Sequence, residues 1–233
     1  MIDVRPFDGL GRFDIDWLAA RHHFSFGHYM DPARMGFGAL RVWNDDTIQP
    51  GTGFDPHPHR DMEIVTYVRK GAITHRDRLG NEGRTEAGDV QVMSAGTGIV
   101  HAEYNFEDEP TQIFQIWILP SGAGFEPRWE ARRFPKDDRA GELVVLASGR
   151  AGDDGALRIN QDAAVIGATV KAGQRVSHRL GKGRKAYLVA ATGSITVNGV
   201  AANARDGVAV ADEDAIEIAA VEDAEIVLVD VPA

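Results

Sequence analysis

The sequence contains no cysteine among its 233 residues. This absence excludes disulfide scaffolds, thiolate zinc sites, iron–sulfur clusters and cysteine nucleophiles, so any metal ion has to be held by histidine, aspartate or glutamate. Basic residues are outnumbered, because 25 lysines and arginines stand against 35 aspartates and glutamates, a formal net charge of −10. That balance argues against direct binding of nucleic acid, which needs a basic surface to neutralise phosphates.

Long hydrophobic runs are also missing. The longest apolar stretches, such as residues 113–119 and 224–229, have the length of a strand, well short of the ~18 residues of a membrane span. The N-terminal segment carries acidic residues and lacks the apolar core of a signal peptide. We therefore expect a cytoplasmic protein without a membrane segment, with a monomer as the default oligomeric state.

Helical periodicity is weak along the whole chain, and short helices are expected only over residues 13–21 and 128–133. Strand signals are frequent instead, as β-branched and apolar runs between Gly, Asn and Asp clusters; they cover residues 63–69, 112–119, 142–147, 186–190, 194–197, 215–219 and 225–231. The sequence Val197-Asn198-Gly199-Val200 is a strong hairpin-turn signal. Many short strands separated by turns predict an all-β sandwich or barrel.

One boundary is visible in the composition. Residues 120–141 are rich in proline, glycine and charge, and seven of the eight histidines precede residue 102. We expect a histidine-rich module over residues 1–134 and a second module over residues 135–233. The spacing from Gly51 to His57 is echoed from Gly173 to His178, which suggests related modules of which the second has lost its polar cluster. The alternative is that all β-rich chains look alike at this level.

The residues that could carry chemistry lie between Gly51 and Asn105. His57-Pro58-His59 and His101-Ala102-Glu103 each place two potential ligands two residues apart. On a strand, such residues point to the same face. Bringing both pairs together would give three imidazoles and one carboxylate. Pro58 cannot donate to a ladder, which places its strand at a start or an edge.

This donor set suits several metal ions. Imidazoles with a carboxylate accept Fe(II), Mn, Ni, Co or Cu, and Zn less distinctively. A site with octahedral geometry and four protein ligands would leave two positions open for substrate and oxygen. A single His-x-His pair is weak evidence, whereas two such pairs in glycine-punctuated strands favour metal binding.

The flanking residues resemble the two cupin motifs. The first reads Gly51, five residues, His57-Pro58-His59, three residues, Glu63, seven residues, Gly71. The second reads Gly88, five residues, Ser94-Ala95-Gly96, four residues, His101, three residues, Asn105. The departures from the general pattern are Ser94 in place of proline, two extra residues before His101 and one extra before Gly71.

The amino-acid sequences of three segments resemble those of the pirin family of cupins. The segments are His23-Phe-Ser-Phe-Gly-His28, Asp55-Pro-His-Pro-His-Arg-Asp-Met-Glu63 and Met93-Ser-Ala-Gly-Thr-Gly-Ile-Val-His-Ala-Glu103. The resemblance covers residues 10–120 strongly and the remainder in layout only. It implies two cupin barrels packed face to face, with one metal ion, usually iron, in the N-terminal barrel and a metal-free second barrel.

The resemblance also implies the roles of individual residues. Its metal ligands correspond to His57, His59, His101 and Glu103. In a general cupin the carboxylate ligand would be Glu63, which we instead expect behind the ligands. For the ion we expect Fe(II), with Mn, Ni, Co, Cu or Zn as alternatives.

The function implied is that of a quercetin 2,3-dioxygenase, which cleaves a flavonol with O2 and releases CO. Glu103 would act as the catalytic base on the substrate hydroxyl. The first alternative is a non-catalytic, iron-dependent redox sensor that binds a regulatory protein partner. The second is another cupin activity, such as an isomerase or a simple binding barrel, because the fold alone does not choose a chemistry.

Other residues give weaker signals. Three histidines, His22, His23 and His28, are more typical of packed loop residues than of ligands, and His178 of an ordinary position. The orientation of His75 stays open between the pocket and solvent. Phe114 and Trp117 are expected in the core, and Trp129 could cover the mouth of the barrel.

Overall fold

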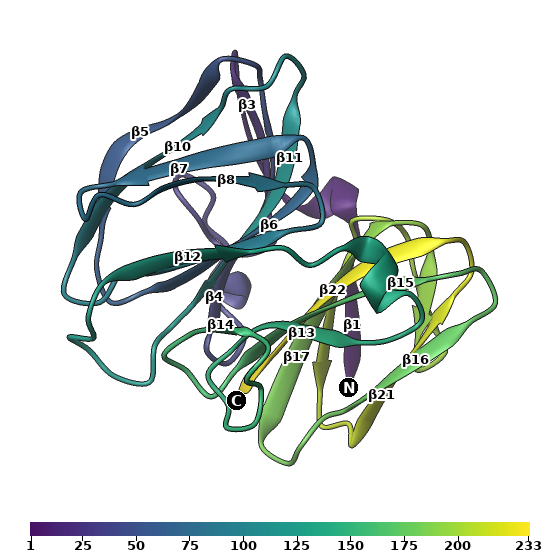
Figure 1. Cartoon of the computed structure of the whole chain (residues 1–233). Helices are drawn as coiled ribbons and strands as arrows, with labels where there is room; N and C mark the ends of the chain where they lie inside the picture. Colours follow the sequence, from purple (N-terminus) through teal and green to yellow (C-terminus); the bar gives the residue numbers. More distant parts are fainter.

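The computed structural model describes all 233 residues, from Met1 to Ala233. It contains 22 strands and three short 3-10 helices, η1 (Phe7–Gly9), η2 (Pro32–Arg34) and η3 (Lys136–Arg139). The strands form two barrels, one above the other in the view of Figure 1, each built from a seven-stranded and a four-stranded sheet. The predicted all-β fold with two barrels is confirmed. No helix is long and apolar enough to cross a membrane.

The first barrel is built from strands of the N-terminal part of the chain. Its seven-stranded sheet has the order β12 (Arg128–Arg132), β9 (Val90–Ser94), β6 (Glu63–Lys70), β11 (Thr111–Ile118), β4 (Leu40–Ile48), β3 (Leu18–His22) and β2 (Gly11–Ile15). Its four-stranded sheet has the order β5 (Thr52–His59), β10 (Ile99–Asn105), β7 (Ala72–Asp77) and β8 (Glu82–Glu86). Strand β5 is an edge strand, as the proline between its two histidines predicts.

The second barrel repeats this topology. Its larger sheet has the order β1 (Ile2–Arg5), β20 (Gly207–Ala211), β17 (Arg184–Thr192), β22 (Ala224–Pro232), β15 (Ala164–Val170), β13 (Val144–Ser148) and β14 (Leu157–Arg158). Its smaller sheet has the order β16 (Arg175–Arg179), β21 (Ala215–Ala220), β18 (Ile195–Val197) and β19 (Val200–Ala202). Strand β16, which carries His178, occupies the position of β5, so the echo in the sequence reflects two related modules.

The ends of the two modules are interleaved. Strand β1, at the start of the chain, pairs antiparallel with β20 of the second barrel and runs beside its green and yellow strands in Figure 1. Strand β12, from the segment between the modules, pairs with β9 of the first barrel. The edge strands β1 and β12 of the two large sheets thus come from the two ends of the first module. The division between residues 134 and 135 stays a prediction.

The prediction of two short helices is wrong. Residues 13–21 form parts of β2 and β3, which pair antiparallel with each other. Residues 128–132 form β12. In both places, pairing with a neighbouring strand outweighs a weak local helical pattern. The hairpin signal is confirmed, because Asn198 and Gly199 both have positive φ, 46° and 83°, between β18 and β19.

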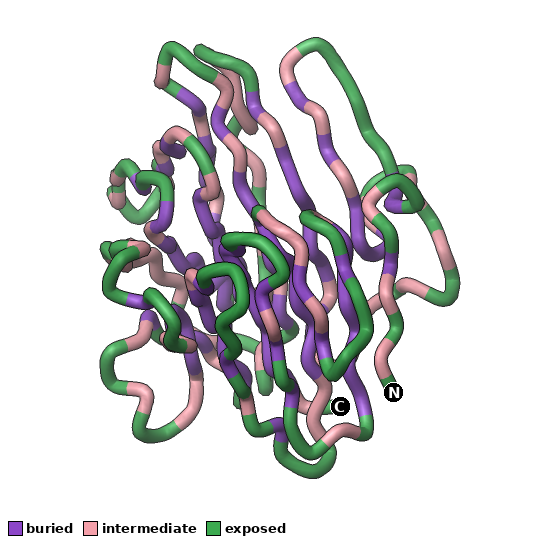
Figure 2. The backbone as a smooth tube through the Cα atoms, turned by 90° about the vertical axis from the view of Figure 1, so that its right-hand side faces the viewer, coloured by how far each residue is buried: buried purple, intermediate pink, exposed green.

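The hydrophobic cores differ between the barrels. The largest cluster, of 23 buried residues, joins the facing large sheets and includes Trp43, Tyr67 and Tyr187. A second cluster of 20 buried residues fills the interior of the second barrel. The interior of the first barrel has only clusters of six and four buried residues. Figure 2 shows the buried segments along the strands and the exposed ones at the turns. The second barrel is filled, whereas the first keeps room inside.

Candidate metal centre

Strand register brings the predicted ligands together on the inner face of the small sheet. His101 on β10 is paired with His57 on β5 and with Asp77 on β7. Glu103 is paired with His75 on β7. Residues two apart share a face, so three inward pairs stand side by side on three adjacent strands. A β-bulge between His101 and Glu103 shifts the register against β5.

Three imidazoles converge at this point. The ring nitrogens of His57, His59 and His101 that face one another all lie within 4.8 Å. Nε2 of His57 is 3.1 Å from Nε2 of His101. The Nδ1 atom of His57 is 2.7 Å from the backbone oxygen of Asp55. Because a carbonyl only accepts, Nδ1 of His57 carries the proton and its Nε2 offers a lone pair to the site.

A chain of hydrogen bonds fixes the tautomer of His101. Nε2 of His75 is 3.0 Å from Oδ2 of Asp77, and Nδ1 of His75 is 3.4 Å from Nδ1 of His101. A carboxylate accepts, so His75 donates from Nε2 and accepts at Nδ1 from His101. Nε2 of His101 then also offers a lone pair. Trp129 stacks on His75 with ring centroids 4.8 Å apart and planes at 6°.

Amide groups hold Glu103. Its Oε1 accepts from Nε2 of Gln91 at 2.6 Å and from the hydroxyl of Thr66 at 3.4 Å. Its Oε2 accepts from Nε2 of Gln115 at 2.8 Å. One oxygen of Glu103 also lies within 4.8 Å of the ligand atoms of His75 and His101. The carboxylate is therefore fixed in orientation next to the imidazoles.

The side chains that donate hydrogen bonds to Glu103 belong to a row of polar residues that crosses the large sheet. Register pairs join His22, Asn44, Gln115, Thr66 and Gln91 in that order across β3, β4, β11, β6 and β9. Nδ1 of His22 is 2.8 Å from Oδ1 of Asn44. Buried polar side chains in folded proteins are generally hydrogen-bonded, as these are. The row is a polar lining for the inside of the barrel.

Burial sets the protonation of the site. It lowers the pKa of His59 to about 4 and that of His101 to about 2, helped in each case by neighbouring histidines. It raises the pKa of Glu103 to about 7, against the hydrogen bonds from Thr66, Gln115 and Gln91. The imidazoles of His59 and His101 are therefore neutral at physiological pH, which is the form that binds metal ions.

The donor set fits a divalent metal ion. Nε2 of His57 and Nε2 of His101 face each other at 3.1 Å, and a third imidazole and a buried carboxylate lie nearby. A cation at this point would be held by the imidazole nitrogens and would offset the burial of the Glu103 carboxylate. Both groups of three or more potential ligands in the structure lie in the first barrel.

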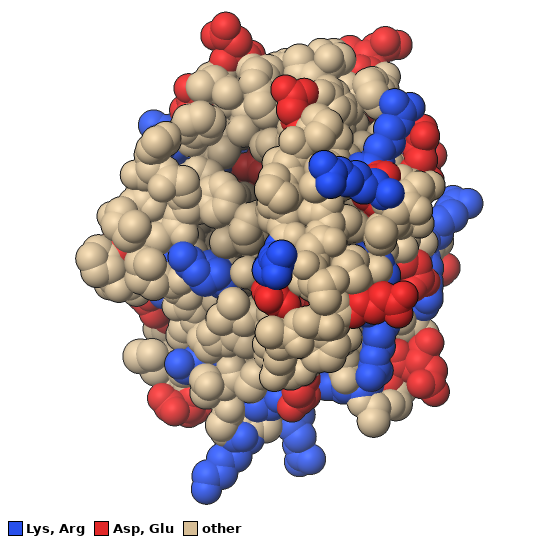
Figure 3. Space-filling view, turned by 90° about the vertical axis from the view of Figure 1, so that its left-hand side faces the viewer, with Lys and Arg blue, Asp and Glu red and all other residues tan.

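A cavity of about 820 Å³ opens beside these residues, inside the first barrel. Its wall includes six aromatic side chains besides histidine, which are Phe13, Trp17, Phe26, Tyr29, Phe54 and Trp117. It also includes the acidic and amide side chains of Asn44, Asp46, Glu103 and Gln115. Figure 3 shows a hollow in the upper part of the molecule with an acidic group at its bottom. The arrangement suits a flat aromatic ligand with polar substituents.

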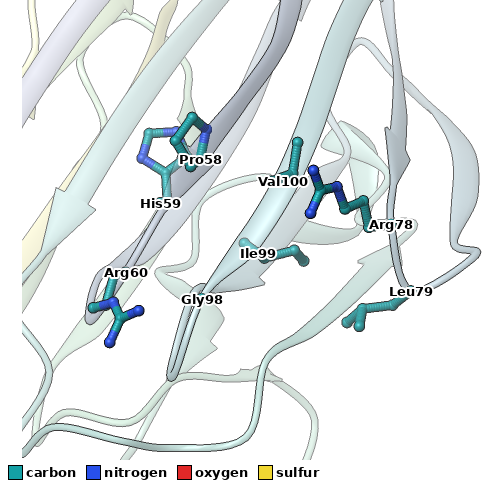
Figure 4. Close-up of a pocket in the computed structure, with 8 residues that line it drawn as sticks. All are labelled: Pro58, His59, Arg60, Arg78, Leu79, Gly98, Ile99 and Val100. Carbon is teal, nitrogen blue, oxygen red and sulfur yellow. The ribbon is translucent and has the colours of Figure 1, made fainter.

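A second cleft, of about 570 Å³, lies on the other side of the β5–β10 pair. Arg60, Arg78, Leu79 and Val100 line it (Figure 4). His59 is the residue that lines both this cleft and the large cavity. The cleft holds no carboxylate or amide side chain, so the groups that could activate a substrate belong to the large cavity.

Glu63 lies in a different environment from the three imidazoles. Its Oε2 accepts from the hydroxyl of Ser94 at 2.6 Å, and its Oε1 accepts from Nδ2 of Asn160 at 3.0 Å. Asn160 follows β14 of the second barrel, so this carboxylate links the two barrels. Its expected place behind the metal ligands stays a prediction.

The remaining aromatic and histidine residues take varied roles. His22 and His28 line the cavity, whereas His23 is buried with Nδ1 2.9 Å from the hydroxyl of Tyr187. Nε2 of His178 is 2.7 Å from Oδ2 of Asp230. Phe114 is in the core, as expected, and Trp117 lines the cavity.

Sequence reasoning missed Asp46, Thr66, Asp77, Gln91 and Gln115 as residues of the site, and it left the orientation of His75 open. The segment from His75 to Asp77 shows the same spacing of two as His57 and His59. That spacing is visible in the sequence. The register between β7 and β10, which places His75 and Asp77 beside His101, is not.

Comparisons with known proteins agree with this geometry. Residues 4–118 match the family model described as Pirin, and residues 145–231 match that of the quercetinase C-terminal cupin domain. A pirin-like protein of Caulobacter vibrioides is 63% identical over 99% of both chains. A quercetin 2,3-dioxygenase of Escherichia coli is 43% identical over 100% of this chain and 99% of its own.

A solved structure of a bacterial pirin from Escherichia coli in complex with nickel(II) has a TM-score of 0.93 at 42% identity, covering 100% of this chain and 99% of that one. The similarity extends over both barrels, which confirms the expected pair of cupin domains. This chain belongs to the pirin family.

Proposed function

We propose that this protein is a metal-dependent dioxygenase that opens the heterocyclic ring of a flavonol-like substrate with O2 and releases CO. The observation that carries the proposal is the cluster of His57, His59 and His101, with Glu103 beside His101, next to a cavity of about 820 Å³ with aromatic walls that His57, His59 and Glu103 line. The printed name of the Escherichia coli relative, quercetin 2,3-dioxygenase, supports the same substrate class.

In this proposal His57, His59, His101 and Glu103 hold one divalent ion, with iron(II) as the expected metal. The nickel(II) complex of the Escherichia coli pirin supports a divalent ion in this family. When bound, the ion supplies a Lewis acid and a template for the substrate oxygens. The imidazoles and the carboxylate held by amide groups form a rigid donor set, which keeps the ligand atoms in place.

The protein's own residues bind and orient the substrate. Phe54 and Trp17, which meet edge to face at 5.2 Å, and Trp117 would pack against a flat ring system and exclude water. Glu103 would accept the proton of the substrate hydroxyl at a carboxyl oxygen. Gln91 and Gln115 would hold that carboxyl group in position throughout. The substrate carbons are oxidised as O2 is reduced, and both oxygen atoms remain in the ester product.

The test is oxygen uptake together with CO release from quercetin by iron-loaded protein. The matched control is His59→Ala, which removes one imidazole from the edge strand without changing the buried holders of Glu103. We expect uptake and CO in the parent, and loss of at least about a hundred-fold in rate in the variant. Equal activity and equal metal content in both proteins would contradict the ligand assignment.

A further inference from the structure

Asp46 is a buried carboxylate that has no protein partner. It lies on β4 and is 2% exposed. No hydrogen bond or ion pair to its side chain exists in the structure, and its Oδ1 is fully buried without a partner. Its neighbours on the same strand are satisfied, because Asp45 pairs with Arg69 and Arg205 and Asn44 pairs with His22.

The surroundings of Asp46 make this isolation costly. Its register partners are Ala20 on β3 and Ile113 on β11, which belong to an apolar cluster at this end of the barrel. A carboxyl group buried without a hydrogen bond destabilises a protein. Burial, with the charges of Asp45 and Glu103, accordingly raises the pKa of Asp46 well above its ordinary value. An apolar side chain between Ala20 and Ile113 would make the folded protein more stable. Stability therefore does not explain why residue 46 is an aspartate.

The cavity provides the explanation. Asp46 lines it together with Ala20, Leu18, Phe54 and Trp17. A ligand that fills the cavity therefore meets Asp46 as a carboxyl group without a protein partner, next to these apolar side chains. We propose that Asp46 is a substrate-binding residue that forms a hydrogen bond with a hydroxyl substituent of the ligand. The proposal rests on the proposed function for the aromatic nature of that ligand.

A hydroxyl group is the partner that fits this position. It can donate to an ionised carboxylate and can equally accept from a protonated one. A ligand carboxylate could bind only to a protonated Asp46, and an ionised Asp46 or Glu103 would repel it. The inference thus narrows the substrate class to planar aromatics that carry a further hydroxyl group besides the one taken by Glu103, and disfavours carboxylated ones.

Calorimetric titration of nickel-loaded protein under nitrogen tests this inference without turnover. The two probes are quercetin and 3-hydroxyflavone, which share the 3-hydroxyl and the neighbouring carbonyl but differ in the remaining hydroxyl groups. We expect the parent to bind quercetin at least about ten-fold more tightly, as one hydrogen bond to a buried carboxyl group predicts. In Asp46→Leu this preference should vanish, mainly through weaker binding of quercetin.

Asp46→Asn is the conservative variant, because it keeps an acceptor and a donor at the same place and should retain part of the preference. Thermal unfolding of Asp46→Leu gives a second readout, and we expect it to be at least as stable as the parent because a buried unpaired carboxyl group is removed. Should Asp46→Leu fail to fold, loss of preference in Asp46→Ala against retention in Asp46→Asn decides the matter.

A parent protein without preference, or a preference unchanged in Asp46→Leu, would overturn the role of Asp46. Failure of the proposed function looks different. If hydroxyl preference depends on Asp46 but iron-loaded protein consumes no oxygen with quercetin, the dioxygenase proposal falls and the binding role of Asp46 stands.

Discussion

At the scale of single residues, the geometry of the centre depends on which nitrogen of each imidazole carries the proton. The backbone oxygen of Asp55 decides this for His57, and the pair formed by His75 and Asp77 decides it for His101. Burial lowers the pKa of His75, although the hydrogen bond to Asp77 opposes the shift. A neutral His75 can accept from His101, so it acts as a positioning residue for a ligand.

His75→Phe tests this role. Phenylalanine keeps a flat ring against Trp129 but cannot accept the proton of His101 at Nδ1. We expect metal affinity to fall about ten- to a hundred-fold, as is usual when a partner behind a ligating histidine is lost. Competition between the protein and a chelator for nickel(II) measures this directly. His75→Gln, which can still accept a hydrogen bond, should recover part of the affinity, and equal affinity in all three proteins would contradict the role.

At the scale of elements, β12 closes the first barrel behind the metal centre. It pairs with β9 and places the indole of Trp129 on His75 and over Gly83 of β8. A Cβ atom at Gly83 would lie 2.2 Å from Cη2 of Trp129. The absence of a side chain at residue 83 therefore makes room for the indole, and the segment at the boundary between the two modules supports the site.

Gly83→Ala should force Trp129 away from His75. We expect a loss of about 1–3 kcal/mol in the free energy of unfolding, the usual range for overpacking, measured by chemical denaturation. Gly155→Ala is the matched control, since a Cβ atom there meets nothing within 4 Å. In a Trp129→Ala background the cost of Gly83→Ala should disappear; a cost that persists there would show that Trp129 is not the obstacle.

At the scale of the whole molecule, the two barrels share one core, and the N-terminal strand β1 belongs to a sheet of the second barrel. The interface holds the largest hydrophobic cluster, and β1 crosses from the N-terminal end to the sheet of the second barrel. The guanidinium group of Arg5 at the end of β1 lies over the rings of Phe24 and Tyr187, 5.2 and 5.5 Å from their centroids. The second barrel is thus packed against the first through this shared core. The alternative role as an iron-dependent regulator stays a prediction.

Removal of residues 1–5 should destabilise the molecule without changing the metal ligands. It would expose the edge of β20 and part of the interface, and we expect a loss of about 2 kcal/mol or more, which is several degrees in Tm for a chain of this size. Nickel(II) stoichiometry at low temperature should remain one per chain. Asp3→Ala, which keeps the strand, is the control. An unchanged Tm after the truncation would mean that β1 contributes little to the second barrel.

The sequence by itself determined the all-β class, the two modules and the inward pairs His57–His59 and His101–Glu103, because alternation along a strand is a local property of two-residue period. It also determined the turn at Asn198 and Gly199, since the preference of asparagine and glycine for positive φ is a local property. It could not determine that β12 is a strand, that His75 and Asp77 stand behind His101, or that Asp46 faces the cavity without a partner. These features depend on the register between strands that are distant in the chain, and a shift of one residue would turn each side chain to the opposite face. Only the packed sheets fix that register.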